Sequence, residues 1–418
     1  MPRNERAILV GVRLPDRTME EEHESLDELA ELARTAGATV AERFVQNRTR
    51  LDGKTYVGSG MIARLKDAAA QYEANLLIFD DDLRPAQARE IEKATDIRVI
   101  DRTELILDIF ARRAQSRAAK LEVELAQSEY ELPRLRRLWE HLDRLGGGIG
   151  TRGPGDTQLE TDRRRIRTRI GVLKRMLEDL EVERSTQRKQ RSALTRVALV
   201  GYTNAGKSTL MNALTGADVF TEDLLFATLD ATTRRLELPG GHAALLTDTV
   251  GLIKKLPHHL VVSFHATLEE VASADLLLHV VDVSRPNCER YMELAEKVLE
   301  EIGAEHRPTR LVFNKIDRVV ESGALGRLGR LYPSAIFTCA TSGEGLDGIR
   351  QAVLAIVESR EEVVEVALPP GDGKTAALVH ERGEVLSRTE DGDSVVMRVR
   401  VSRPDAERLR KLGVVREA

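Results

Sequence analysis

The chain has 418 residues, of which 42% are hydrophobic and 31% charged, with a formal net charge of −5. This composition predicts a globular protein of two to four domains, and no apolar run reaches the roughly 18 residues that a membrane-spanning helix needs. With two cysteines, Cys288 and Cys339, the chain has no disulfide framework or zinc cluster, and its charged N-terminus is unlike a secretory signal. We therefore expect a cytoplasmic protein, and we expect a monomer.

Residues 1–110 alternate between apolar runs typical of strands and amphipathic stretches typical of helices. Strands that alternate with helices pair in parallel, so the pattern predicts a small parallel α/β unit. The expected strands are 7–12, 39–45, 75–79 and 98–100, and the expected helices lie near 20–35, 60–73 and 85–94. We interpret Gly58 and Gly60 as the cap of the second helix rather than as an anion site.

Residues 111–195 predict a helical hairpin around a glycine-rich tip loop at 146–155. Apolar residues on both sides of this loop recur at alternating spacings of four and three, the heptad pattern of two packed antiparallel helices. The positions are Leu121, Leu125, Ser128 (polar), Leu132, Leu135, Trp139 and Leu142, then Ile166, Ile170, Leu173, Leu177 and Leu180. Pro133 should bend the first helix. From Leu121 to Leu142 this helix would be about 32 Å long. Thr157 and Glu160 should cap the second helix.

Positive charge is concentrated on this hairpin. Residues 134–175 contain twelve Lys and Arg against five Asp and Glu, a net charge of +7, so the rest of the chain carries −12. Such a segment indicates a polyanion such as RNA, although a solvated helical face carries the same pattern. The loop is longer than a reversal of two helices requires, which favours insertion into an RNA-lined cavity over a plain hinge. The candidates for RNA contact are Arg144, Arg152, Arg163, Arg164 and Arg165.

Residues 196–360 contain four short motifs, and the first three directly follow apolar runs that predict strands. The first fits the phosphate loop Gly-x-x-x-x-Gly-Lys-Ser, whose backbone N–H groups and lysine surround phosphates and whose serine binds a metal ion. Parallel strands end at one edge of a sheet, so the motifs should form one pocket. They comprise Gly201, Tyr202, Thr203, Asn204, Ala205, Gly206, Lys207 and Ser208; Asp248, Thr249, Val250 and Gly251; Asn314, Lys315, Ile316 and Asp317; and Thr338, Cys339 and Ala340.

The third motif selects the base. Asp317 can accept from the N1–H and the exocyclic amine of guanine, and Asn314 can donate to N7. Adenine reverses the donor pattern on that edge and would leave a buried carboxylate facing an acceptor. The motifs therefore predict a pocket for GTP or GDP with Mg²⁺, in which Lys207 reaches the β- and γ-phosphates and Ser208 ligates the metal. For Cys339 within the fourth motif we expect a packing role.

The tail at 361–418 predicts a small C-terminal α/β module without a catalytic constellation. Its expected strands are 363–368 and 394–401, and its expected helices lie near 374–382 and 403–412. The fold class predicted for the whole chain is therefore α/β, with a P-loop GTPase domain between the hairpin and this module.

Four runs of the sequence resemble the HflX family of ribosome-associated GTPases, of the TRAFAC class. They are DRTELILDIFARRA at 101–114, GGIGTRGPGDTQLE at 147–160, LFATLD at 225–230 and DTVGLIKKLPH at 248–258. The resemblance covers about residues 50–360 and implies binding to the large ribosomal subunit and its RNA, with the hairpin loop directed at the peptidyl-transferase region. It also implies dissociation of stalled or idle ribosomes. The chain departs from the family at Asp156, where glutamate is typical, and at Leu252, where phenylalanine is common.

The resemblance assigns a switch segment to residues 220–234 and a second one to 249–264. It favours Thr228 over Thr232 and Thr233 as the threonine that closes on Mg²⁺ and the γ-phosphate. Asp248 should reach Mg²⁺ through water, so the expected metal-binding residues are Ser208, Thr228 and Asp248. The first switch adds further residues to the expected GTP site, namely Phe226, Ala227, Thr228, Leu229 and Asp230.

Leu252 bears on hydrolysis, because the residue at this position in Ras-like enzymes is a glutamine that orients the attacking water. Leucine cannot hydrogen-bond, so we expect slow intrinsic turnover that the ribosome stimulates. Asn204 resembles the asparagine that holds K⁺ in potassium-activated relatives, and a role in loop conformation is equally open. The expected catalytic residues are Lys207, Thr228, Gly251 and Asn204; we interpret His258, His259 and His265 as structural.

Two other functions are open to this sequence. One is a GTPase in ribosome assembly or RNA modification, which shares the pocket but gives no reason for the long tip loop. The other is a switch without RNA, which binds a protein through residues 1–110 and uses the hairpin as a spacer.

Overall fold

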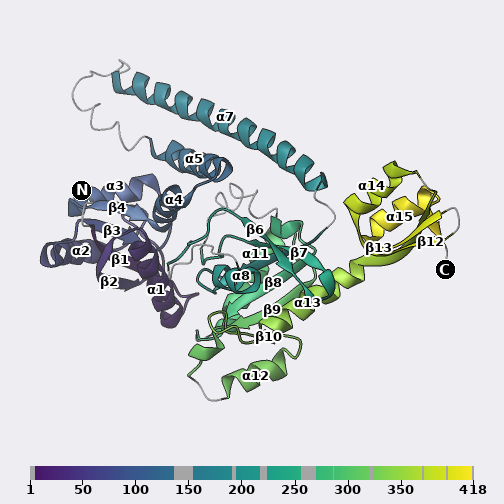
Figure 1. Cartoon of the computed structure of the whole chain (residues 1–418). Coiled ribbons are helices and arrows are strands. Elements are labelled where there is room, and N and C mark those ends of the chain that lie inside the picture. Colours follow the sequence, from purple (N-terminus) through teal and green to yellow (C-terminus); the bar gives the residue numbers. More distant parts are fainter. Residues whose placement is uncertain are drawn as a thin grey trace. The chain divides into compact units, whose positions relative to one another are not determined.

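The computed structural model (Figure 1) describes residues 5–135, 154–190, 194–216, 224–255, 270–285, 287–320, 323–369, 371–391 and 394–416. The chain forms two compact units. The first comprises Met1–Glu183, Phe220–Asp230 and Val250–Leu268, and the second comprises Arg184–Val219, Ala231–Thr249 and Glu269–Ala418. Within the described residues, no helix is both long and apolar enough to cross a membrane.

The first unit contains a parallel four-stranded sheet in the order β2-β1-β3-β4. The central strands β1 and β3 are buried on both faces, which explains why they read as continuous apolar runs. All four expected strands and three expected helices are confirmed, Gly58 is the N-cap of α2, and α4 was not predicted. The elements are β1 (Arg6–Arg13), α1 (Met19–Thr35), β2 (Thr39–Asn47), α2 (Ser59–Tyr72), β3 (Leu76–Phe79), α3 (Pro85–Thr95), β4 (Arg98–Asp101) and α4 (Arg102–Arg113).

Two helices belong to the hairpin region, α5 (Arg117–Glu131) and α7 (Pro154–Gln190), and the first unit includes α7 as far as Glu183. Leu121 and Leu125 of α5 pack with Leu173 of α7, and all three are positions of the predicted seam. After α5 the chain forms a 3₁₀ turn, η1 (Leu132–Arg134), as expected for the proline at 133.

The start of α7 corrects the predicted boundary of the tip loop. The helix begins at Pro154, so residues 154 and 155 are helical and the predicted cap at Thr157 lies inside the helix. Proline is favoured in the first turn because the N–H that it lacks would have no partner there. The rest of the loop, together with Trp139, Leu142, Arg144 and Arg152, lies outside the described residues.

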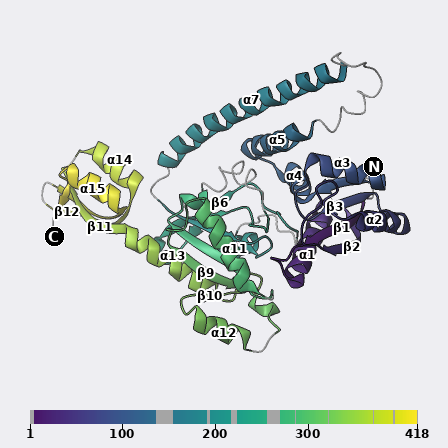
Figure 2. The ribbon, with the colours of Figure 1, turned by 180° about the vertical axis from the view of Figure 1, so that it is seen from behind.

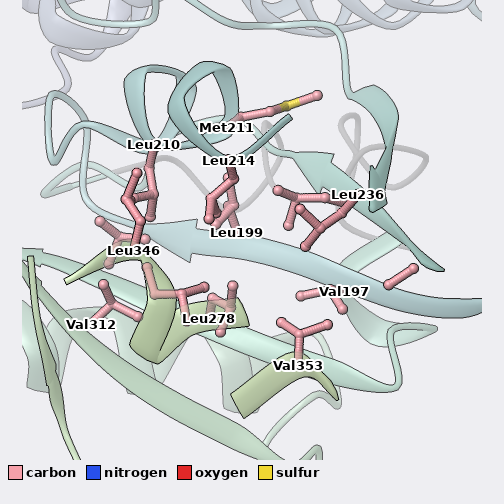
Figure 3. Close-up of a cluster of buried hydrophobic side chains, with 14 of the residues drawn as sticks. Val197, Leu199, Leu210, Met211, Leu214, Leu236, Leu278, Val312, Leu346 and Val353 are labelled. Atoms are coloured by element: carbon pink, nitrogen blue, oxygen red, sulfur yellow. The ribbon is translucent and has the colours of Figure 1, made fainter. Parts of the chain in front are cut away.

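The second unit is built on a six-stranded sheet in the order β10-β9-β8-β5-β7-β6, in which only β6 runs antiparallel. Figure 3 shows Leu210 and Leu214 of α8 above Leu199 of β5, with Leu278 and Val353 below. The elements are β5 (Thr195–Gly201), α8 (Lys207–Thr215), β6 (Thr232–Glu237), η2 (Pro239–Gly241), β7 (Ala243–Asp248), β8 (Leu276–Asp282), α11 (Cys288–Glu301), β9 (Thr309–Asn314), η3 (Ile316–Arg318), α12 (Ala324–Leu331), β10 (Ile336–Phe337) and α13 (Leu346–Arg360).

The C-terminal module belongs to this second unit. Its elements follow one another in the order β-α-β-β-α-β, which is the order of the split β-α-β fold. Its antiparallel sheet runs β12-β13-β11-β14, and α14 and α15 pack on one face of it (Figure 2). Two expected strands and both expected helices are confirmed, whereas β12 and β14 were not predicted. The elements are β11 (Glu361–Leu368), α14 (Gly373–Arg382), β12 (Gly383–Asp391), β13 (Ser394–Ser402), α15 (Arg403–Lys411) and β14 (Val415–Arg416).

Candidate nucleotide site

The second unit brings the carboxyl ends of its parallel strands together, as the motifs predict. The phosphate loop follows β5, Asp248 ends β7, Asn314 ends β9 and Thr338 follows β10. These strands pair in parallel through β8, so their ends lie at one edge of the sheet. This is the edge at which doubly wound sheets bind their ligands.

The two glycines of the phosphate loop are required by close approach. A Cβ atom on Gly201 would lie 2.2 Å from the carbonyl oxygen of Val280, and one on Gly206 would lie 2.3 Å from Nδ2 of Asn314. Both residues have positive φ angles, of 147° and 92°, which side chains disfavour. Asn204 also lies in the left-handed region with φ of 60°, a conformation that asparagine tolerates better than most residues.

Lys207 is the first residue of α8, and its side chain is buried in the phosphate loop. Its Nζ donates to the carbonyl oxygens of Gly201 at 3.1 Å and Tyr202 at 2.9 Å. Burial lowers the pKa of Lys207 to about 8, against the opposing effect of Asp248. Carbonyl oxygens of the loop itself therefore accept the hydrogen bonds of this ammonium group, which phosphate oxygens would accept in a nucleotide complex.

Ser208 in the first turn of α8 and Asp248 at the end of β7 provide adjacent oxygen atoms. The Ser208 hydroxyl donates to Oδ2 of Asp248 at 2.6 Å, and Asp248 is fully buried. A hydroxyl and a carboxylate are ligands that Mg²⁺ accepts, so the two residues fit this ion. In the described ranges no group of three or more His, Cys, Asp or Glu residues could hold a metal.

Asn314 ties three of the motifs together. Its Nδ2 donates to the carbonyl oxygen of Ala205 at 2.9 Å, and its Oδ1 accepts from the backbone N–H of Ala340 at 3.1 Å. One amide N–H is used in this way, and the second can serve N7 of guanine. Cys339 is buried and its backbone N–H donates to the carbonyl oxygen of Glu344, in agreement with a packing role. Asp317 is exposed in η3.

Asp282 also lies at the site, although it belongs to none of the four motifs and was not predicted. Nζ of Lys315 lies 2.8 Å from Oδ2 of Asp282, the last residue of β8. The same Nζ donates to the carbonyl oxygen of Asn204 at 2.7 Å. A signal was present in the sequence, because Asp282 ends an apolar run in the same way as Asp248 and Asn314.

Residues 224–230 of the first switch pack within the first unit. The rings of Phe226 and Phe110 meet edge to face, with centroids 4.6 Å apart. The carboxylate of Asp230 accepts from the backbone N–H groups of Gln115 at 2.9 Å and Ser116 at 3.2 Å, at the start of α5. Asp230 thus stabilises a helix N-terminus in this structure.

Residues 250–255 of the second switch also pack within the first unit. Lys254 pairs with Glu24 at 2.9 Å, and Lys255 pairs with Asp80 and with Asp81. Leu252 is buried, so the side chain that replaces the glutamine of Ras-like enzymes is packed. Residues 256–269, including the three histidines, lie outside the described range.

The three candidate switch threonines differ in setting. Thr232 and Thr233 belong to β6, where the Thr233 hydroxyl lies 2.9 Å from that of Thr247. Thr228 is outside any strand and half-buried. Thr249, directly after β7, donates its hydroxyl to the carbonyl oxygen of Leu199 in β5 at 2.7 Å. The choice of Thr228 stays a prediction.

His279 of β8 is a buried histidine that we expect to make the second unit sensitive to acid. Burial, and secondarily the charge of Lys207, lowers its pKa to about 4. Asp282 and Arg285 line the same small cavity as His279. Below pH 6.5 the unfolded chain binds a proton that the folded chain excludes, so stability falls as the pH falls toward 4. Between pH 6.5 and 5 this amounts to about 2 kcal/mol.

The measurement is urea unfolding of the wild type and of His279→Leu at pH 6.5 and pH 5. We expect the stability of the variant to fall by about 2 kcal/mol less than that of the wild type over this interval. Equal losses in the two proteins would show that His279 is not the group responsible.

Comparison with known proteins agrees with this geometry. Family models match residues 23–111 (GTP-binding GTPase N-terminal), 113–191 (GTP-binding GTPase Middle Region) and 196–315 (50S ribosome-binding GTPase). GTPase HflX of Caldanaerobacter subterraneus is 46% identical, covering 97% of this chain and 93% of its own. GTPase HflX of Escherichia coli is 40% identical, covering 97% and 96%.

A crystal structure of a GTP-binding protein from Sulfolobus solfataricus in complex with GDP is similar over 85% of this chain and 99% of its own, with 23% identity and a TM-score of 0.45. The extent of identity to the HflX proteins, together with the phosphate loop, the Ser208–Asp248 pair and the guanine motif, leads to one assignment. The chain belongs to the HflX family of GTPases: it binds guanine nucleotides and hydrolyses GTP.

Proposed function

We propose that this GTPase binds the large ribosomal subunit in the cytoplasm and uses its GTP cycle to dissociate or rescue stalled or idle ribosomes. The observation that carries the proposal is the basic face of α7, found in a chain whose GTPase domain matches a model described as a 50S ribosome-binding GTPase. A cluster of exposed basic residues on one segment is the electrostatic pattern of a nucleic-acid partner.

The basic residues of α7 include two that pair with acids of α5 and others that have no such pair among the described residues. Arg169 and Lys174 pair with Glu124 and Glu129 of α5, and so hold the two helices together. Arg164 and Arg165 are exposed, as is Arg167, whereas Arg163 is half-buried. Exposed guanidinium groups at this spacing suit the phosphates of an RNA backbone. Ribosomal RNA is therefore the partner that we assign to this face.

In the proposed cycle, Lys207 neutralises charge on the β- and γ-phosphates, and Thr228 and Gly251 respond to the γ-phosphate. Ser208 and Thr228, and Asp248 through water, would hold Mg²⁺, which would supply further positive charge to the transferred phosphoryl group. Leu252 has no group that could orient water, so intrinsic turnover is slow and the ribosome accelerates it. Asn204 would hold a K⁺ ion, which would supply the stabilisation that an arginine finger supplies elsewhere.

The test is co-sedimentation with large ribosomal subunits in the presence of a non-hydrolysable GTP analogue or GDP, over a series of salt concentrations. A variant with Arg164→Glu, Arg165→Glu and Arg167→Glu should bind at least about 100-fold more weakly. Its slope of log affinity against log salt should fall by about 2 to 3, because each lost phosphate contact removes about 0.9. Deleting residues 146–155 should abolish subunit dissociation, and wild-type turnover on ribosomes should be faster in potassium than in sodium.

A matched control reverses three exposed charges elsewhere, Arg330→Glu, Arg403→Glu and Lys411→Glu, and should bind as the wild type does. The ribosome proposal is wrong if the wild type stays in the supernatant with the analogue and the deletion changes nothing. Equal turnover in potassium and sodium would exclude the role of K⁺, and the ribosome proposal would stand.

A further inference from the structure

The acid at the end of β8 occupies a position between the guanine motif and the phosphate loop. Asp282 pairs with Asn314 in the parallel register of β8 and β9, and the backbone N–H of Val283 donates to the carbonyl oxygen of Asn314 at 3.1 Å. The next residue of β9, Lys315, therefore starts beside Asp282. Asp282 belongs to none of the four motifs, although it lies at the same sheet edge as Asp248.

The carboxylate of Asp282 has a defined direction, because each of its oxygens is engaged. Oδ1 accepts from the backbone N–H of Ser284 at 3.0 Å and from the Ser284 hydroxyl at 2.6 Å. Oδ2 lies 2.8 Å from Nζ of Lys315 and 3.8 Å from Nε of Arg285. The side chain is 8% exposed and that of Lys315 is 15% exposed, so solvent screens this ion pair weakly.

Lys315 continues from this ion pair to the phosphate loop. Its Nζ donates to the backbone carbonyl oxygen of Asn204 at 2.7 Å and lies 3.4 Å from Asn204 Oδ1. Both residues have φ angles in the left-handed region, 64° for Lys315 and 60° for Asn204. Such backbone persists where surrounding contacts determine it. The ammonium group therefore bridges an acid on β8 and the turn of the phosphate loop.

We propose that Asp282 is a positioning residue for nucleotide binding, which acts by aiming Lys315 at Asn204 and so holds the phosphate loop in its binding conformation. It touches neither phosphate nor base in this assignment. If Asp282 loses its charge, Lys315 loses its only acidic partner among the described residues, and its side chain is no longer aimed at Asn204. The turn at Asn204 then loses a fixed hydrogen-bond donor. The loop then has to be ordered by the nucleotide itself, which lowers affinity. The proposal rests on guanine-nucleotide binding and is independent of the ribosome.

The test compares Asp282→Asn with Asp275→Asn, a matched control at the other end of the same strand. Asp275 is also 8% exposed and ion-paired, with Arg196 and Arg360, but it lies at the amino end of β8. Fluorescent mant-GDP titration of the full chain should show about ten- to hundredfold weaker binding for Asp282→Asn. The control should bind within about twofold of the wild type, even if its thermal stability falls.

Two further measurements separate positioning from a general structural role. The ratio of GDP to IDP affinity should be unchanged in Asp282→Asn, because base recognition by Asp317 is intact. In a Lys315→Met background, Asp282→Asn should cause no further loss, since an interaction that acts through Lys315 cannot be lost twice. Unchanged GDP affinity, a changed GDP to IDP ratio or fully additive losses would each overturn the proposal.

The conservative variant Asp282→Glu covers the case in which Asp282→Asn does not fold. It keeps the charge but displaces it by one methylene, so GDP binding should be weaker than in the wild type by a smaller factor. Wild-type affinity in Asp282→Glu would contradict a role that depends on direction.

Discussion

Asp317→Asn is expected to transfer the nucleotide preference of this GTPase from guanine to xanthine. The carboxylate accepts from two donors of guanine, whereas an asparagine amide offers one acceptor and one donor, which matches the N1–H and the 2-carbonyl of xanthine. Hydrogen bonds to a charged group contribute about 1.5–3 kcal/mol each, so GTP binding should weaken at least about 100-fold. Asp317 is exposed in η3, and its loss should leave stability unchanged.

Direct titration with mant-GTP and mant-XTP measures this exchange, with hydrolysis of GTP and XTP as a second readout. Asp347→Asn is a suitable control, because Asp347 is a highly exposed acid in the first turn of α13. If Asp317→Asn keeps GTP affinity within about threefold of the wild type, the assignment of the base-recognition motif is wrong.

Lys207→Met is expected to reduce GTP turnover by about 10²- to 10³-fold without destabilising the nucleotide-free protein. Removing one preorganised charge from the transferred phosphoryl group has an effect of this size in other enzymes. Methionine fills a similar volume, and replacing a buried charge by an apolar group is often neutral or stabilising. The lowered pKa of Lys207, about 8, reflects the cost of burying its charge.

Single-turnover hydrolysis with thermal unfolding of the nucleotide-free protein tests both halves of this prediction. Lys374→Met, at an exposed lysine in the first turn of α14, controls for the loss of a positive charge. Turnover within about fivefold of the wild type would contradict the catalytic role of Lys207, and a large loss of stability would contradict the account of its burial.

The elements that the sequence predicts well are those whose signal is local. The central strands β1, β3, β5 and β8 are buried on both faces, so each appears as a short apolar run. The phosphate loop and the guanine motif follow such runs, and the parallel order of the strands then places them at one edge. By contrast, β12 is an exposed edge strand with little apolar alternation, and nothing local distinguishes it from a loop.

The site shows the same division. Motif residues such as Lys207, Ser208 and Asn314 can be identified from spacing, because phosphate and guanine demand particular donors close together in the chain. Spacing cannot identify partners that come from distant segments. One of them is Asp230, whose carboxylate accepts from the backbone N–H groups at the start of α5.

By itself, the sequence determined that this chain carries a guanine-nucleotide pocket of the HflX family and a basic helical segment. Only the tertiary structure decided which side chains hold that pocket in shape, with Asp282 beside Lys315 as the clearest case. The physical reason is distance along the chain. A ligand-binding motif is written in consecutive residues, whereas a buried ion pair across two strands depends on a register that forms only when the sheet does.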